Sequence, residues 1–71
     1  MKMQLIIKNE FGVSKSQMLE VDEEQYQKML EISKDFHSRS FHMDLEDNGG
    51  HVFIPPEIVK KSILIVKLIA D

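Results

Sequence analysis

The strongest hydrophobic pattern of the chain lies near its C-terminal end, where residues 62–69 read Ser-Ile-Leu-Ile-Val-Lys-Leu-Ile. This run is short, rich in β-branched residues and apolar on both faces that a strand would present, with Lys67 as its only charged member. Such a run is typical of a strand covered on both sides, and on an exposed edge it would favour aggregation. The pattern therefore predicts a central strand at 62–69.

A strict alternation of apolar and polar residues marks a hairpin before this run. Residues 41–46 read Phe-His-Met-Asp-Leu-Glu, and Asp-Asn-Gly-Gly follows at 47–50. Asn48-Gly49 favours a two-residue loop, because a type I′ turn needs positive φ at both central residues. The resulting register pairs Asp47 with Gly50, Glu46 with His51, Leu45 with Val52, Asp44 with Phe53, and Met43 with Ile54. It predicts one apolar face and a second face that carries the charged residues and Phe53.

Two prolines end the predicted hairpin. Neither Pro55 nor Pro56 can donate a backbone hydrogen bond to a ladder, and Pro56 suits the first position of a helix. Glu57 near the start and two lysines near the end complement the helix dipole. We therefore expect a short helix at 57–61 between the hairpin and the last strand.

The N-terminal part of the chain predicts two further strands. Residues 2–8 alternate so that Met3, Leu5 and Ile7 share one face. Turn-forming residues follow at 9–12, and residues 13–21 are a second extended candidate whose best alternation lies at 17–21.

Residues 22–37 have the apolar spacing of an amphipathic helix. Asp22 is a favourable N-cap, Gln25 stands at the reciprocal capping-box position, and Val21 and Tyr26 occupy the positions of a hydrophobic staple. The apolar face of the helix is expected to comprise Tyr26, Met29, Leu30, Ser33, Phe36 and His37.

These elements predict one α+β domain over residues 1–71, because a chain of this length has room for one core. The expected order is β-β-α-β-β-short helix-β, in a small, mostly antiparallel sheet with one helix packed on one face. The other face would expose Phe53, Ile63, Ile65 and Ile69, with Phe11 as a further contact candidate. Such an apolar patch predicts an interface, most often in a symmetric homodimer. The alternative is that Phe11 and the 9–18 segment fold over this face.

Composition narrows the class of protein. There is no cysteine, so disulfides are excluded, and the net charge is −3 at pH 7. This charge argues against a surface that binds nucleic acid as a whole, and it leaves room for a local basic patch. No run approaches the roughly 18 apolar residues of a membrane span, and the N-terminal apolar run is too short for a signal peptide. We therefore expect a cytoplasmic protein with no membrane partner.

Candidate chemistry is sparse. The sequence has no glycine-rich phosphate loop and no Ser-His-Asp spacing. His37, His42 and His51 lie close to acidic residues, but their spacing matches no metal-ligand pattern. In the expected register His51 faces Glu46 as a cross-strand pair. The sequence therefore predicts no enzyme, no cofactor and no metal.

Residues 50–61 form a local motif, Gly-His-Val-Phe-Ile-Pro-Pro-Glu-Ile-Val-Lys-Lys, in which a strand ends in Ile-Pro and enters a short basic helix. This motif resembles the core of the swapped-hairpin transition-state regulators and antitoxins, which bind DNA as dimers through basic residues on the hairpin. The resemblance implies DNA binding by His51, Lys60 and Lys61. His51 stands where an arginine is usual, the Leu-Gly-Ile turn and the following Gly-Asp are missing, and the forty preceding residues have no counterpart. A plain strand-to-helix corner explains the same residues.

Two further stretches, 21–26 and 53–63, give the whole chain a similarity to small uncharacterised proteins carried by phages and mobile elements of Gram-positive bacteria. This similarity implies no activity and no site residues. The function predicted from the sequence is a non-enzymatic interaction protein that self-associates through a sheet face and binds an unidentified protein. The alternative is a DNA-binding transcription regulator or antitoxin.

Overall fold

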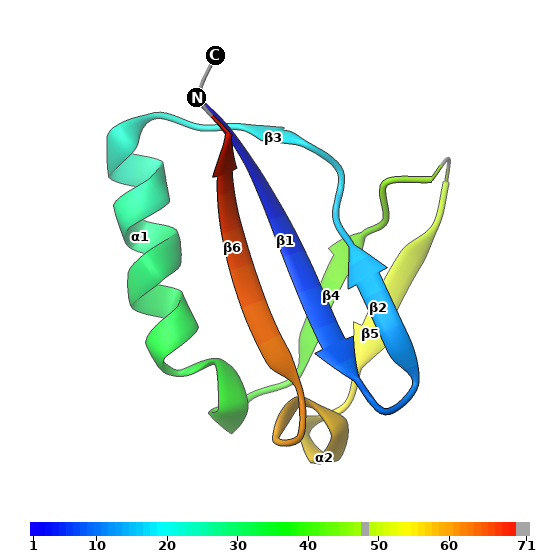
Figure 1. Cartoon of the computed structure of the whole chain (residues 1–71). Helices are drawn as coiled ribbons and strands as arrows, with labels where there is room; N and C mark the ends of the chain where they lie inside the picture. The colour runs from blue at the N-terminus through cyan, green and yellow to red at the C-terminus, as the bar shows by residue number, and fades with distance from the viewer. Residues whose placement is uncertain (48, 70–71) are drawn as a thin grey trace.

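The computed structural model describes residues 1–47 and 49–69 and has the predicted α+β architecture, with antiparallel sheets and one main helix (Figure 1). The elements in chain order are β1 (Lys2–Asn9), β2 (Gly12–Lys15), β3 (Leu19–Glu20), α1 (Glu23–Lys34), the 3₁₀ helix η1 (Phe36–Ser38), β4 (Phe41–Asp44), β5 (His51–Ile54), α2 (Pro56–Val59) and β6 (Ile63–Ile69). The predicted order of strands and helices is confirmed, with the second extended segment divided into β2 and β3.

The first layer is a sheet in which β1 is the central strand. This strand pairs with β6 from Lys2↔Ile69 to Lys8↔Ile63, while β2 and β3 share its other edge. The prediction of a central strand at 62–69 was therefore wrong, because β6 lies at the edge of this sheet. The physical reason is that the hairpin before β6 belongs to the other layer. Among the described strands, β6 therefore pairs with β1 alone.

The partner of β1 in the first hairpin is Gly12–Lys15, and the expected strand at 17–21 is reduced to two residues. The turn residues explain this difference. Gly12 has φ +128°, which favours glycine, and the backbone N of Phe11 donates to Oδ1 of Asn9 at 2.9 Å. The chain therefore reverses directly after Asn9.

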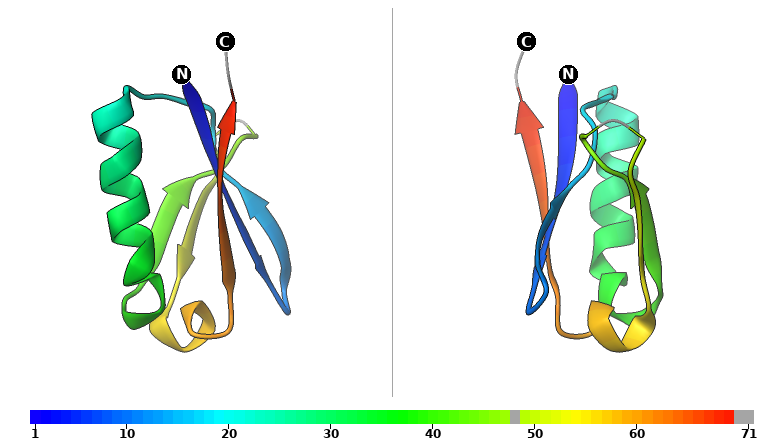
Figure 2. Two further views of the ribbon diagram at one scale, coloured as in Figure 1. Left: turned by 60° about the vertical axis from the view of Figure 1, so that its left-hand side comes forward. Right: turned by 90° about the vertical axis from the view of Figure 1, so that its right-hand side faces the viewer.

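The second layer contains the β4–β5 hairpin and α1 (Figure 2). Asp44 pairs with His51 and Met43 with Val52, so the predicted register was wrong by two residues. Because the shift is even, Met43 and Ile54 still point into the core as expected. Asn48, and with it the predicted two-residue turn, lies outside the described residues.

The two layers meet where β2 ends. Ser16 and Leu45 form a bridge, the backbone N of Gln17 donates to O of Asp44 at 3.3 Å, and the backbone N of Glu46 donates to O of Lys15 at 3.0 Å. The N–H of Glu46 thus points to the end of β2, away from β5. The hairpin ladder closes at Leu45 and Gly50, where the backbone N of Leu45 donates to O of Gly50 at 2.9 Å, and not at the predicted pair of Asp47 with Gly50.

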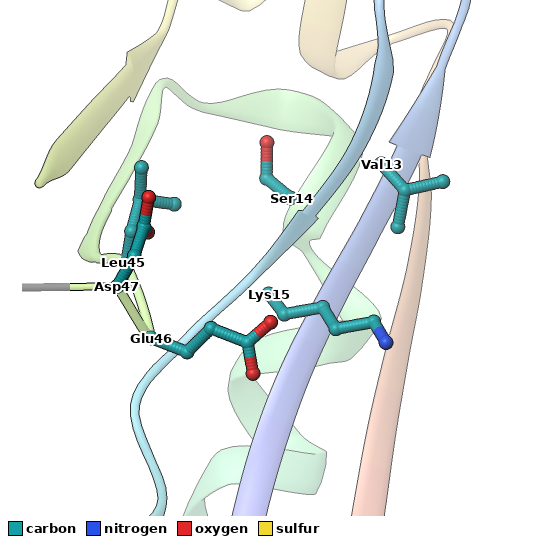
Figure 3. Close-up of a pocket in the computed structure, with 6 residues that line it drawn as sticks. All are labelled: Val13, Ser14, Lys15, Leu45, Glu46 and Asp47. Carbon is teal, nitrogen blue, oxygen red and sulfur yellow. The ribbon is translucent and has the colours of Figure 1, made fainter.

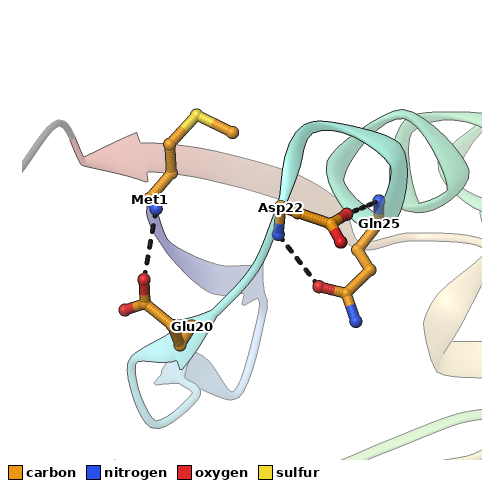
Figure 4. Close-up of polar contacts among 4 residues, drawn as sticks. All are labelled: Met1, Glu20, Asp22 and Gln25. Carbon is orange, nitrogen blue, oxygen red and sulfur yellow. Dashed lines mark hydrogen bonds and ion pairs between the residues drawn. The ribbon is translucent and has the colours of Figure 1, made fainter.

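The helix α1 begins with the predicted capping box (Figure 4). The backbone N of Gln25 donates to Oδ1 of Asp22 at 2.7 Å, and the backbone N of Asp22 donates to Oε1 of Gln25 at 2.9 Å. The helix ends at Lys34, earlier than expected. Phe36 is instead carried by η1, where it is 2 % exposed and belongs to the core.

The core lies between the two layers. Its buried members come from β1, η1, the hairpin and α2; they are Met3, Leu5, Ile7, Phe36, Met43, Ile54 and Val59. The short helix α2 starts at Pro56, as expected, but spans Pro56–Val59 in place of 57–61. It presents Val59, which is fully buried, to the end of the core.

Candidate interaction surface

The outer face of the β1 sheet carries alternate residues of each strand. Because Leu5 and Ile7 are buried, Ile6 and Lys8 point to the opposite, outer side. Residues paired across strands share a side, so the register extends this face to β2 and β6. Its rows are Val13–Lys8–Ile63, Lys15–Ile6–Ile65, Gln4–Lys67 and Glu20–Lys2–Ile69. We call Lys2, Ile6, Lys8, Val13, Lys15, Ile63, Ile65, Lys67 and Ile69 the lysine–isoleucine face.

Several aliphatic side chains of this face are open to water. Ile63 is 62 % exposed and Val13 57 %, while Ile6 and Ile65 are half-buried between their neighbours. Phe11, in the turn that joins β1 to β2, is 76 % exposed. The helix and the hairpin lie on the other side of this sheet (Figure 2), so the apolar surface is left uncovered by the described elements.

The lysine–isoleucine face is locally basic although the chain carries a net charge of −3. Each of the four described rows contains one lysine. Two acidic side chains at its margins are already engaged. Oε1 of Glu20 lies 3.2 Å from the N-terminal amine of Met1 (Figure 4), and Oε2 of Glu46 accepts a hydrogen bond from Nε2 of Gln4 at 3.2 Å. The lysines of the face are therefore available to an external partner.

The outer edge of β6 presents free backbone groups. The backbone N of Leu5 donates to Oγ of Ser16, and its O accepts from the backbone N of Ser16, each at 2.8 Å. Both groups of Leu5 thus point away from β6, and so its partner Val66 points its own N–H and C=O away from β1. The direction alternates along a strand, so Leu64 and Leu68 do the same.

The helix lies in the second layer, beyond the edge of β6 (Figures 1 and 2). It covers that side of β6 incompletely. Leu68 belongs to the inward-facing set of β6 but is 40 % exposed, and Ile32 of α1 is 45 % exposed. Within the described chain, no residue of α1 is fully buried. Apolar surface therefore accompanies the free backbone groups at this edge.

The four interface candidates from the sequence do not lie on one surface. Ile63 and Ile65 belong to the lysine–isoleucine face, and Phe11 lies in the turn beside it. Phe53, 64 % exposed, points outward from the β4–β5 hairpin, where it pairs with His42. Since the core lies between the two layers, Phe53 and Ile63 face opposite sides of the molecule. The sequence pattern placed them together because it assigned all strands to one sheet.

The three residues of the DNA-binding alternative are also divided. His51 lies on the outward face of the hairpin, while Lys60 and Lys61 follow α2 in the turn to β6. All three are exposed. The hairpin face that carries His51 also carries Asp44, so it is not a uniformly basic strip.

The expected pair of His51 with Glu46 was wrong, because the register pairs His51 with Asp44. Nδ1 of His51 lies 2.8 Å from Oδ1 of Asp44, and Nε2 of His51 lies 3.2 Å from Nδ1 of His42. The His42 ring also stacks on Phe53, with centroids 6.5 Å apart. These contacts form a polar chain, Asp44–His51–His42, along an exposed strand face.

Two cavities lie near these surfaces. One of about 440 Å³ is lined by Val13, Ser14, Lys15, Leu45, Glu46 and Asp47 (Figure 3). A second, of about 290 Å³ and mostly apolar, is lined by Leu5, Ser16, Gln17, Leu19, Met29, Phe41, His42, Met43 and Asp44. The hydroxyl of Ser16 accepts from the backbone N of Leu5 and donates to O of Gln17, so its hydrogen-bonding capacity serves the backbone.

Over residues 1–47 and 49–69, no group of three or more His, Asp or Glu side chains is arranged to hold a metal ion. Neither α1 nor α2, the α-helices of the described chain, is long and apolar enough to cross a membrane.

Comparison with protein-family models, with curated proteins and with solved structures finds no match. The candidate surface therefore depends on geometry alone. Sequence reasoning missed the basic character of the sheet face, although residues 2–8 carried a signal for it. Lys2 and Lys8 alternate with the buried set, and only the pairing with β2 and β6 brings Lys15 and Lys67 to the same side.

Proposed function

We propose that the protein is a non-enzymatic, cytoplasmic interaction module that self-associates through strand β6. The observation that carries this proposal is that β6 is a seven-residue apolar strand with one unpaired edge in the described structure. A second copy that adds its own β6 to this edge would supply the missing hydrogen-bond partners.

An unpaired edge of this composition needs a partner. Natural proteins protect edge strands with prolines, bulges or several charged residues. In β6 the residues are Ile-Leu-Ile-Val-Lys-Leu-Ile, so Lys67 is the only charged residue and there is no proline. An exposed strand of this kind is a template for pairing with another chain. A closed pair of two β6 strands would remove that hazard.

The charge of the sheet argues for contact at the edge in place of contact across the face. Two copies packed face to face would bring their lysines together, and like charges at an interface oppose association. Pairing at the edge keeps the lysine–isoleucine faces of both copies side by side and open. We therefore place the homodimer contact at the β6 edge and not, as expected from the sequence, on the sheet face.

A two-fold axis perpendicular to the sheet at Val66 gives the most complete register. It pairs Val66 with its own copy and Leu64 with Leu68 of the second copy, so the free N–H and C=O groups of all three residues are satisfied. On the outer side, Lys67 then lies opposite Ile65 of the second copy. An axis at Lys67 would place two lysines opposite each other, which is destabilising.

Sedimentation velocity of the purified protein over about 1–300 μM tests self-association, and we expect a shift from monomer to dimer across that range. In Leu68→Pro the ring removes an N–H that points to the free edge, so the monomer should fold while the dimer is lost. Val13→Glu is the matched control, because it alters the exposed face far from β6 and should leave the dimer intact.

Two results would count against the proposal. A wild-type monomer over the whole concentration range would remove self-association altogether. Dissociation by Val13→Glu with an undisturbed Leu68→Pro dimer would move the contact to the sheet face. A proton–nitrogen NMR spectrum of each variant shows whether it is folded before its mass is interpreted.

A further inference from the structure

We infer that the lysine–isoleucine face binds an acidic amphipathic helix of a partner protein. This inference goes beyond self-association, because the face belongs to each single chain and β6 pairing would leave it open. It depends on two features of the sheet, which are the position of its aliphatic side chains and the distribution of its lysines.

The aliphatic side chains of the face are contiguous. Ile6 on β1 lies directly beside Ile65 on β6, and Ile63 follows Ile65 on the same side of its strand. Val13 lies one row away on β2, on the far side of Lys8. Ile6, Ile63 and Ile65 form an apolar patch, with Val13 beyond Lys8, on a sheet whose other side is covered by the second layer.

The lysines surround this patch. Lys15 lies beside Ile6 on β2, Lys67 follows Ile65 on β6, and Lys8 separates Val13 from Ile63. A partner that matches this arrangement needs an apolar stripe with carboxylates on both of its flanks. A helix with apolar residues at i, i+3, i+4 and i+7 and glutamates or aspartates at the neighbouring positions has this form. Helix against sheet is also a standard way to complete a layered domain.

Two other acidic partners fit the face less well. Single-stranded nucleic acid is bound through aromatic side chains on which bases stack, and the rows of this face contain aliphatic residues and lysines, with Phe11 only in the adjoining turn. An anionic membrane is bound through apolar side chains that insert below the headgroups, and the two central isoleucines of this face, Ile6 and Ile65, are half-buried between their neighbours. A protein helix places both kinds of group at matching depth.

Charge complementarity also favours a partner other than the chain's own helix. Although α1 and its flanking residues carry acidic side chains, two of these are already paired with lysines, Glu24 with Lys28 at 3.5 Å and Glu31 with Lys34 at 3.1 Å. The apolar side of α1 is turned toward its own core, where Tyr26 and Met29 pack.

The test uses fluorescence anisotropy with a labelled synthetic helix that carries leucines at i, i+3, i+4 and i+7 and glutamates elsewhere. Two further probes have the same leucines with lysines elsewhere, and the same glutamates with serines in place of leucine. We expect saturable binding of the Leu/Glu helix alone, with an affinity that falls as salt is raised. The measurement is made at a protein concentration at which sedimentation shows monomer, so failure of self-association does not affect it.

Two double variants are compared. One carries Lys8→Glu and Lys67→Glu on the face, and the other carries Lys28→Glu and Lys34→Glu on α1, so both change the net charge equally. The first should weaken binding of the Leu/Glu helix about tenfold or more, and the second less than about twofold. Equal losses in both variants, or no binding of this helix up to the highest protein concentration that sedimentation shows to be monomeric, would overturn the inference. Tighter binding of oligothymidylate or of phosphatidylserine vesicles with the same variant pattern would also overturn it, in favour of nucleic acid or membrane.

Discussion

Ser16 and Leu5 are joined by two hydrogen bonds at the point where the two layers meet. The backbone N of Leu5 donates to Oγ of Ser16 and the backbone N of Ser16 donates to O of Leu5, both at 2.8 Å. Ser16 is 3 % exposed, and its backbone O also accepts from Nε2 of the buried Gln4 at 3.0 Å. A buried serine thus replaces a regular ladder contact at the end of β2 and allows the chain to cross to the hairpin.

Ser16→Ala should therefore destabilise the protein. The change leaves the buried N–H of Leu5 without its acceptor, which costs about 1–3 kcal/mol. Urea unfolding followed by circular dichroism measures this loss. Ser14→Ala, two residues earlier on β2, is the control, because its hydroxyl makes no hydrogen bond within the described residues and its removal should cost less than about 0.5 kcal/mol. Equal stabilities of the two variants would contradict the role given to Ser16.

The sequence was a good guide wherever the signal was local. The capping box of Asp22 and Gln25 and the buried set of β1 were predicted correctly, because each depends on residues a few positions apart. The hairpin register was not, because the ladder closes where the backbone N of Leu45 donates to O of Gly50, at a point where Leu45 also bridges to Ser16, which is remote in the sequence. The position of β6 within its sheet was predicted wrongly for a similar reason. An apolar run shows that a strand can be covered on both sides, and only the topology shows which neighbours it has.

Asp22→Ala should destabilise α1 by about 1 kcal/mol, because the side chain caps the first turn and completes a reciprocal pair with Gln25. Asp35→Ala is a control of the same residue type at the other end of the helix. There a carboxylate opposes the helix dipole, so its removal should be neutral or stabilising by up to about 0.5 kcal/mol. Thermal unfolding of both variants gives the comparison. A larger loss in Asp35→Ala would reverse the assignment of the cap.

The chain of Asp44, His51 and His42 fixes the tautomers of two histidines. The carboxylate of Asp44 can only accept, so Nδ1 of His51 carries the proton. Nε2 of neutral His51 is then an acceptor, and Nδ1 of His42 donates to it. His37 provides an internal contrast, because its Nε2 lies 2.8 Å from the carbonyl O of Ser62 and must be the donor.

Nitrogen NMR at about pH 8 should accordingly find the Nδ1–H form at His51 and His42 and the Nε2–H form at His37. Asp44→Ala should shift the first two toward the Nε2–H form and leave His37 unchanged. A His51 that stays in the Nε2–H form in the wild type would exclude the bond to Asp44.

Val59 and Ile63, four residues apart on either side of the turn into β6, should respond differently to truncation. Val59 is fully buried, so Val59→Ala should cost about 2 kcal/mol through lost burial and the cavity left behind. Ile63 is 62 % exposed, so Ile63→Ala should cost less than about 1 kcal/mol in a monomer. If β6 pairs with a second copy, the cost of Ile63→Ala should grow with protein concentration, because the dimer adds a contact from Ile63 to Ile69 of the second copy. Urea unfolding at low and high protein concentration measures both. A cost at Ile63 that is independent of concentration would mean that this side chain gains no partner.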